Sequence, residues 1–320
     1  MSNKRILVTG AAGFIGFHLC KYLRAREDAV IGLDNFNDYY DPQIKFDRTE
    51  KLKALDIEVT KGDILDVDLL EKLVVKNKIT HLVHLAAQAG VRYSLVNPSA
   101  YVKTNIDGFL TILELCRKHP EIYLTYASSS SVYGTNTKTP FSIDDRTDHQ
   151  ASFYGVTKKT NELMAQAYHH LYKIPVTGLR FFTVYGPWGR PDMAYFSFTK
   201  AILENRPIDV YNFGKMSRDF TYVDDIVAGI AAAVDLESSY EIFNLGNNQP
   251  EPLSSLIESI ENALGKKATQ RQMPMQSGDV EATYADIETS TKKLGFLPKT
   301  SLKEGIGKFV EWYQGYFSSC

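Results

Sequence analysis

Residues 4–16 form the stretch KRILVTGAAGFIG, in which an apolar run meets an apolar helical segment at a glycine-rich turn. The run at 6–8 predicts a buried strand, and residues 14–23 carry apolar side chains at helical spacing. Glycines let the backbone approach a ligand, and the helix N-terminus offers free N–H groups and the positive end of its dipole. A pyrophosphate suits such a turn, so the sequence predicts cofactor contacts by Gly10, Gly13, Phe14, Ile15 and Gly16.

A second predicted strand, residues 30–33, is followed by Asp34. Its carboxylate stands near the position from which an acid binds an adenosine ribose hydroxyl in dinucleotide sites. Asn35 follows and no arginine stands beside it, so the pattern favours NAD over NADP. The glycine spacing is G-x-x-G-x-x-G and not G-x-G-x-x-G, and the alternative interpretation is a tight turn without a ligand.

Length and charge narrow the class of protein. The chain has 320 residues, 44% of them hydrophobic, enough for one large α/β domain with an appended lobe or for two domains. The formal net charge of -2 gives no electrostatic basis for binding nucleic acid or a membrane surface. No apolar stretch has the length of a membrane span, and the first strand begins so early that no signal peptide is expected.

The three cysteines form no C-x-x-C pair, which favours a reducing compartment, so we expect the protein in the cytoplasm. Cys20 and Cys116 fall within helical patterns and are predicted core residues. His149, His169 and His170 have no accompanying carboxylate cluster, so no metal site is predicted.

Strands and helices alternate through the first half of the chain. We predict strands at 57–61, 81–85, 122–127 and 176–182, and helices at 65–76, 98–118 and 153–172. Residues 35–48 are expected to pass irregularly over the cofactor site. Strands that alternate with crossover helices predict an α/β fold with a doubly wound, parallel Rossmann sheet.

The alternation ends after about Pro187. Helices at 193–204, 253–264 and 302–316 and strands at 208–211 and 242–245 are too discontinuous for a second Rossmann unit. We therefore predict an NAD-binding domain at 1–187 and a smaller α/β substrate lobe at 188–320, with interwoven segments.

The clearest catalytic pattern is Tyr154-Gly-Val-Thr-Lys158. Residues four apart lie on one face of a helix, so the ammonium of Lys158 can stand beside the Tyr154 phenol. A free phenol has a pKa near 10, and a fixed ammonium and a nicotinamide cation both favour the phenolate. Tyr154 then becomes a general base for a sugar or alcohol hydroxyl. The alternative is an amphipathic surface pair.

Two further features stand near this pattern. The serines at 128–131 follow the strand before the helix, at an edge where open α/β sheets bind ligands, and a serine there can relay a proton to Tyr154. A polar loop or a helix N-cap is the alternative. Asn105 interrupts an apolar helix, as expected near a cofactor or in a buried hydrogen-bonded bridge between helices.

Taken together, G-x-x-G-x-x-G, the element at 129–134 (SSSVYG) and Y-x-x-x-K resemble the extended short-chain dehydrogenase/reductase family. The resemblance extends to 180–187 (RFFTVYGP) and 218–226 (RDFTYVDDI), and so spans essentially the whole chain. It implies tightly held NAD, a nucleotide diphosphate sugar as substrate, and a homodimer built through helices 98–118 and 153–172.

The resemblance also implies site residues. Ser129 corresponds to a proton-relaying hydroxyl, Arg218 to a diphosphate ligand and Asp279 to a contact of the nucleotide ribose; a surface ion pair is the alternative for the last two. The implied cofactor contacts are Asp34, Asn35, Asp63, Ile64, Leu85, Ala86, Ala87, Gln88, Asn105, Tyr154, Lys158 and Phe182.

Three stretches, at 37–41, 86–92 and 181–194, are most similar to UDP-glucuronate 4-epimerases within this family. Thr183 and Gln276 differ from the residues usual in UDP-galactose 4-epimerases. The resemblance implies that Tyr154 takes the 4-hydroxyl proton while a hydride passes from C4 to NAD, and that the 4-keto sugar turns before the hydride returns. The substrate contacts expected are Arg92, Ser129, Ser130, Ser131, Thr183, Arg190, Arg218 and Asp279.

Three alternatives stay open at this point. A UDP-glucuronate decarboxylase of the UDP-xylose synthase type shares every motif quoted above. A UDP-glucose/galactose 4-epimerase shares most of them. A dinucleotide-binding sensor without turnover usually lacks the Tyr or Lys that this chain has.

Overall fold

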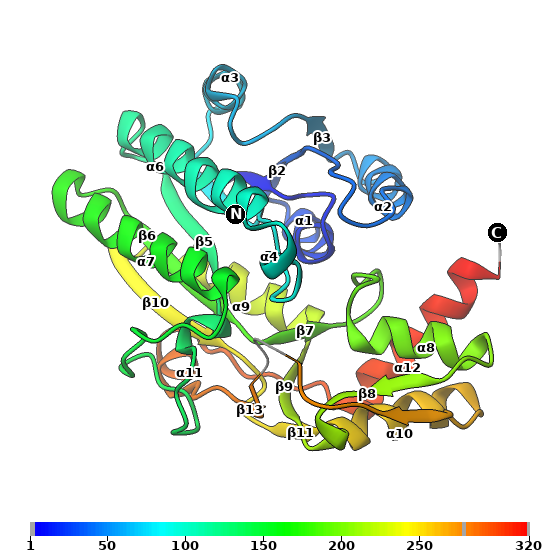
Figure 1. Ribbon diagram of the computed structural model, residues 1–320. Helices are drawn as coiled ribbons and strands as arrows, with labels where there is room; N and C mark the ends of the chain where they lie inside the picture. Colours follow the sequence, from blue (N-terminus) through cyan, green and yellow to red (C-terminus); the bar gives the residue numbers. More distant parts are fainter. Residues whose placement is uncertain (1–3, 277–279, 319–320) are drawn as a thin grey trace.

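The computed structural model describes residues 4–276 and 280–318. Its centre is a seven-stranded sheet in the order β10-β6-β5-β4-β1-β2-β3 (Figure 1). Every neighbouring pair is parallel, which confirms the predicted doubly wound α/β fold. The strands are β1 (Arg5–Thr9), β2 (Ala29–Asp34), β3 (Glu58–Lys61), β4 (His81–His84), β5 (Tyr123–Ser129), β6 (Val176–Phe181) and β10 (Tyr240–Leu245).

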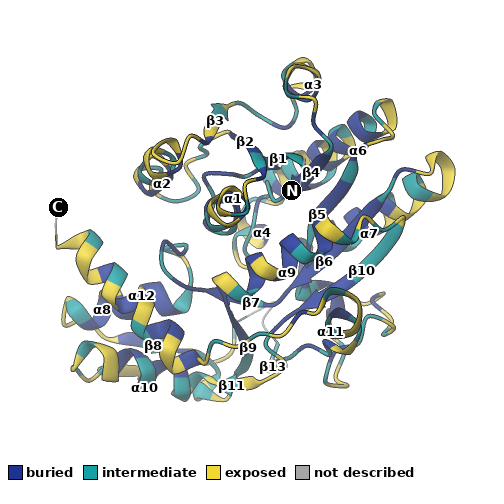
Figure 2. Ribbon diagram, turned by 180° about the vertical axis from the view of Figure 1, so that it is seen from behind, coloured by how far each residue is buried: buried dark blue, intermediate teal, exposed yellow. Residues whose placement is uncertain are grey.

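Helices cover both faces of the sheet, because the strands carry apolar side chains on both faces. Along β1, Ile6 and Val8 belong to one buried cluster, with residues of α1 (Phe14–Ala25) and α9 (Val223–Leu236). Leu7 belongs to a second cluster, with residues of α3 (Val67–Asn77), α6 (Gly108–Lys118) and α7 (Phe153–Tyr172). Figure 2 shows β6 buried along its whole length between these layers.

Residues beyond 187 return to the large sheet. Helix α9 packs on α1, and β10 pairs with β6, with Phe243 opposite Leu179. The predicted strand at 242–245 therefore belongs to the large sheet, next to a strand about sixty residues earlier in the chain. The division at residue 187 stays a prediction.

The other C-terminal elements form a smaller α/β assembly, below the large sheet in Figure 1. Strand β9 (Ser217–Tyr222) pairs with β7 (Thr183–Tyr185), β11 (Pro250–Pro252) and β13 (Ala282–Thr283), and β8 (Ile208–Val210) pairs with β12 (Gln270–Gln272). Aromatic side chains join α8 (Ala194–Leu203) to α12 (Leu302–Phe317), where Phe196 packs edge-on against Tyr313. Helix α10 (Leu253–Leu264) completes it, whereas α11 (Glu288–Leu294) packs on α9 and β10 beside the large sheet.

Two predicted segments differ from the structure. The segment at 35–48 is irregular only to Pro42, because α2 (Gln43–Lys53) begins there; its buried face includes Lys45 and Arg48, so charge hid the helical pattern. The predicted helix at 98–118 is continuous but changes geometry, from α5 (Pro98–Tyr101) through a π-helical turn, η1 (Val102–Asp107), to α6.

Cys20 and Cys116 are free and fully buried, which confirms their prediction as core residues. Within the described ranges, no helix is long and apolar enough to cross a bilayer.

Candidate active site

A cavity of about 1070 Å³ lies at the carboxyl ends of the central strands and extends to β8 and β9. Most of the residues predicted for the site line this one space. They are Gly10, Gly13, Phe14, Ile15, Gly16, Asp34, Asn35, Ile64, Leu85, Ala86, Ala87, Gln88, Arg92, Ser129, Ser130, Ser131, Tyr154, Lys158, Phe182, Thr183, Arg190 and Arg218. Of the described residues predicted, Asp63 and Asn105 are not part of the lining, and Asp279 lies outside the described ranges.

The turn after β1 has the shape that its glycines allow. Gly10 has a φ of +74°, and a Cβ there would stand 2.8 Å from the backbone nitrogen of Ala86. A Cβ at Gly16 would stand 2.1 Å from the Gly10 oxygen. Within the described part of the chain, no side chain caps α1 and its first turn carries no acid, so the N–H groups there can receive an anion.

Asp34 ends β2 and is almost fully buried beside that turn. Its Oδ2 accepts from the Ala12 N–H at 3.0 Å and its Oδ1 from the Phe36 N–H at 2.8 Å. Burial raises the pKa of Asp34, and the two N–H groups and the Lys45 ammonium oppose that rise. Asn35 donates to Asp63 at 2.9 Å, so Asp63 orients Asn35 from behind the cavity wall.

Asn105 lies in the π-helical turn and bridges two parts of the site. Its Oδ1 accepts from the Gln88 N–H at 2.8 Å, and its Nδ2 donates to the Gln88 carbonyl at 3.0 Å. Nδ2 also donates to the Thr157 hydroxyl of α7 at 3.0 Å. Asn105 thus holds the loop after β4 against the helix that carries Tyr154.

Tyr154 and Lys158 stand on the first turns of α7, whose start is capped by the Ser152 side chain. The Lys158 ammonium donates to the Ala127 carbonyl of β5 at 2.8 Å, and burial lowers its pKa to about 8. Burial raises the pKa of the Tyr154 phenol, and the neighbouring Ser129 side chain opposes that rise. The three side chains predicted to be catalytic therefore share one wall of the cavity.

The serine run is not a loop. Ser128 and Ser129 are the last residues of β5, two beyond the predicted end, and Ser130 and Ser131 begin a 3-10 turn, η2 (Ser130–Tyr133). The strand continues because it pairs with β6 as far as Ser129 opposite Phe181. The Ser129 hydroxyl accepts from the Ser131 N–H at 3.1 Å, which closes the turn.

Sequence reasoning placed Arg190 at the substrate but missed the polar cluster that it forms with Tyr39 and Asp192 in the cavity lining. Tyr39 donates to Asp192 at 3.1 Å, and Arg190 donates to the same carboxylate at 3.0 Å. Burial acts to raise the pKa of Asp192, but the Arg190 guanidinium outweighs it and the pKa is lowered. The aspartate and the tyrosine fall within stretches quoted for the family resemblance, which was the signal available.

Residues at the mouth of the cavity come from both parts of the fold. The Arg92 guanidinium stands 5.0 Å from the centre of the Tyr211 ring. Arg218 of β9 donates to the carbonyls of Ser217 at 2.9 Å and Glu281 at 3.1 Å. Lining residues that the sequence did not predict include Lys45, Arg206, Asp209, Tyr211 and Met216.

A model of the NAD dependent epimerase/dehydratase family matches residues 6–246. UDP-glucuronate 4-epimerase 4 of Arabidopsis thaliana is 50% identical over 331 residues, 98% of this chain and 76% of that protein. Protein CapI of Staphylococcus aureus is 49% identical over 332 residues, 98% of this chain and 99% of that protein. The crystal structure of UDP-glucuronic acid 4-epimerase from Bacillus cereus with UDP-glucuronic acid and NAD superposes with a TM-score of 0.91 at 35% identity, covering 98% and 99% of the two chains.

Proposed function

This chain belongs to the NAD dependent epimerase/dehydratase family, and on that premise we propose that it converts UDP-glucuronate to UDP-galacturonate by inverting C4. Relatives with about half of their residues identical carry that 4-epimerase name. The observation that carries the proposal is the meeting of Ser129, Tyr154 and Lys158 in the cavity that the glycine turn borders. The serines and Thr183 line that space too.

The residues of the first half fit NAD. The backbone at Gly10 and the uncapped start of α1 suit a pyrophosphate, and the Asp34 carboxylate suits a ribose hydroxyl. When bound, NAD supplies a hydride acceptor and donor, so that C4 can pass through a ketone and return inverted.

Tyr154 is the proton acceptor in this proposal. Its phenolate takes the proton of the 4-hydroxyl, and Ser129 bridges the sugar oxygen to the phenol. Lys158 is fixed by the Ala127 carbonyl, and its positive charge favours the phenolate over the phenol. On return, the Tyr154 proton passes back to the oxygen at C4, so no net proton is consumed.

We assign the uronate carboxylate to hydroxyl groups. A carboxylate is costly to desolvate unless donors meet it, and Ser130, Ser131 and Thr183 offer donors without a strong charge. A β-keto acid loses carbon dioxide easily, so the site must hold this carboxylate against decarboxylation. Arg218 of β9, which also lines the cavity, is assigned to the diphosphate, because a guanidinium matches phosphate oxygens.

We further propose a homodimer through the helices that run from 98 to 118 and from 153 to 172. Helices α6 and α7 lie side by side over one face of the sheet (Figure 1). Large apolar side chains remain exposed along these helices and along α4 (Tyr93–Val96), and apolar surface of this kind is suited to contact with a second copy. They are Leu95, Val96, Val102, Leu110, Val156, Leu163, Leu171 and Tyr172.

We also propose a cytoplasmic location, because the buried cysteines are unpaired.

The test is a proton NMR time course of the protein with NAD and UDP-glucuronate, with UDP-glucose in a parallel sample. The proposal expects UDP-galacturonate and no loss of carbon dioxide. Tyr154→Phe should reduce the rate by about 10²–10⁴-fold. A pentose product would make the chain a decarboxylase, turnover of UDP-glucose alone would make it a hexose epimerase, and no turnover would favour a binding protein.

A further inference from the structure

Strand β5 and helix α7 meet through a regular set of polar contacts. Three consecutive residues of β5 contact three residues of α7 that are spaced four apart and so share one helix face. The pairs are Ala127 with Lys158, Ser129 with Tyr154 and, as the third, Ser128 with Glu162. Two of these pairs contain the proposed catalytic side chains, and the third contains none.

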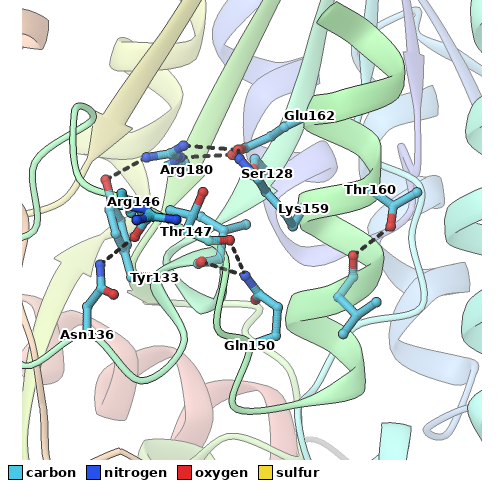
Figure 3. A network of polar contacts seen from close by, with 12 residues as sticks. Ser128, Tyr133, Asn136, Arg146, Thr147, Gln150, Lys159, Thr160, Glu162 and Arg180 are labelled. Atoms are coloured by element: carbon cyan, nitrogen blue, oxygen red, sulfur yellow. Dashed lines mark hydrogen bonds and ion pairs between the residues drawn. The ribbon is translucent and has the colours of Figure 1, made fainter. Parts of the chain in front are cut away.

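The third pair leads into a buried ion pair (Figure 3). Glu162 is 2% exposed and accepts from the Ser128 hydroxyl at 2.7 Å. Arg180 of β6 is 3% exposed and binds both oxygens of Glu162, at 2.8 Å through Nε and 3.0 Å through Nη2. Lys159 approaches the same carboxylate at 3.5 Å from the helix exterior.

Arg180 also reaches the far end of the serine run. Its Nη1 donates to the Tyr133 hydroxyl at 3.0 Å, and the guanidinium stands 4.9 Å from the centre of that ring. Tyr133 donates in turn to Asn244 of β10 at 2.7 Å. Because Ser128 and Tyr133 bound the segment that carries Ser129, Ser130 and Ser131, the ion pair holds that segment at both ends.

A buried ion pair needs a reason other than stability. Removing two charges from water is expensive, and apolar side chains of similar volume often stabilise such a site as well or better. Among the residues that the structure describes, the cavity lining includes neither Glu162 nor Arg180, so they are not placed to touch a substrate. What they do is join α7, β5, β6 and the serine turn in one fixed arrangement.

We infer that the Glu162–Arg180 pair is a positioning pair, which sets the register of α7 against β5 and thereby holds Tyr154 at Ser129. The inference rests on the proposed function, in which Tyr154 is the base. Catalytic groups need placement within a fraction of an ångström, and supporting hydrogen bonds supply it. The proposed function assigns the diphosphate to Arg218 of β9, so we expect nucleotide binding to be largely retained without this pair.

The test is the double variant Glu162→Leu/Arg180→Met, which replaces the ion pair by apolar side chains. We expect a melting temperature close to that of the wild type, a KM for UDP-glucuronate within about threefold, and a kcat lower by about 10- to 100-fold. Glu261→Gln is the matched control, because Glu261 is also buried and paired with a lysine but lies on α10. That control should leave kcat unchanged.

A folded double variant with the kcat of the wild type would overturn the positioning role and leave the proposed function standing. A wild-type protein that does not epimerise UDP-glucuronate would overturn both. If the double variant does not fold, Glu162→Gln replaces it, because it keeps the side-chain volume. For Glu162→Gln we again expect a lowered kcat with an unchanged KM, and an unchanged kcat would overturn the inference.

Discussion

The backbone N–H of Ala12 donates to the carboxylate of Asp34 at 3.0 Å, so the glycine turn and the end of β2 are directly joined. Asp34 thus orients the turn and offers its remaining acceptor positions to the cavity. We predict that Asp34→Asn weakens NAD binding by about tenfold or more, because an amide NH₂ replaces one acceptor. Titration calorimetry with NAD measures this. Asp68→Asn, on an exposed position of α3, is the control, and an equal effect of both variants would contradict the assignment.

Thr183 begins β7 and lines the part of the cavity assigned to the uronate. Thr183→Asn should raise the Kd of UDP-glucuronate by about tenfold, which corresponds to the loss of one hydrogen bond to a charged group. The Kd of UDP-glucose should change by less than about twofold. Calorimetry on the inactive Tyr154→Phe background gives both values. An equal loss for the two sugars would show that Thr183 does not recognise the carboxylate.

His84 of β4 is buried and shares a hydrogen bond of 2.8 Å with the Thr9 hydroxyl. Burial, and secondarily the Lys158 charge, lower the pKa of His84 to about 3. The unfolded chain binds a proton near pH 6.5 while the folded one does not, so His84 lowers the free energy of unfolding as pH falls below 6.5. Between pH 7 and pH 5 that loss is about 2 kcal/mol.

The variant His84→Asn should not show this part of the pH dependence. Urea unfolding of the wild type and the variant at pH 7 and pH 5 isolates the contribution of His84, because both proteins have all other titrating groups in common. The wild type should lose about 2 kcal/mol more than the variant. Equal losses would mean that His84 is protonated in the folded state.

Leu163 is 54% exposed on α7 and belongs to the helix face proposed for the dimer. Leu163→Glu should convert the dimer to a monomer, because a charge would be buried between two copies of an apolar face. Light scattering after size exclusion gives the mass. Val75→Glu on α3, where the side chain is 60% exposed, is the control and should stay dimeric. A wild-type monomer would contradict the proposal at once.

The sequence was sufficient for the part of the fold whose signals are local. The glycine turn, the apolar strands and the helix at 153–172 each follow from neighbouring residues, and the helix bounds agree with α7. The place of β10 depends on a pairing with β6 across a long stretch of chain, which no local pattern encodes. The π-helical turn carries Asn105, whose side chain contacts Gln88 and Thr157, and these contacts between distant segments exist only in the folded protein.

In the site, too, the residues that belong to local motifs were predicted and those that depend on tertiary packing were not. Gly10, Tyr154 and Lys158 stand in motifs whose spacing carries their chemistry, and the structure places them on one cavity. No local pattern indicated the structural role of Arg48. Its buried guanidinium binds the Ala12 carbonyl at 2.8 Å and the Trp188 carbonyl of a distant loop. Such partners come together through tertiary packing, and a charged helix in sequence looks like an exposed one.

In the proposed reaction, C4 is inverted through transient oxidation at that carbon. The measurement that tests it most directly is the conversion of UDP-glucuronate that carries deuterium at C4, followed by proton NMR in ordinary water. We predict UDP-galacturonate that keeps the deuterium at C4, because the hydrogen returns to the carbon it left. A pentose product, or an epimer with ordinary hydrogen at C4, would contradict the account.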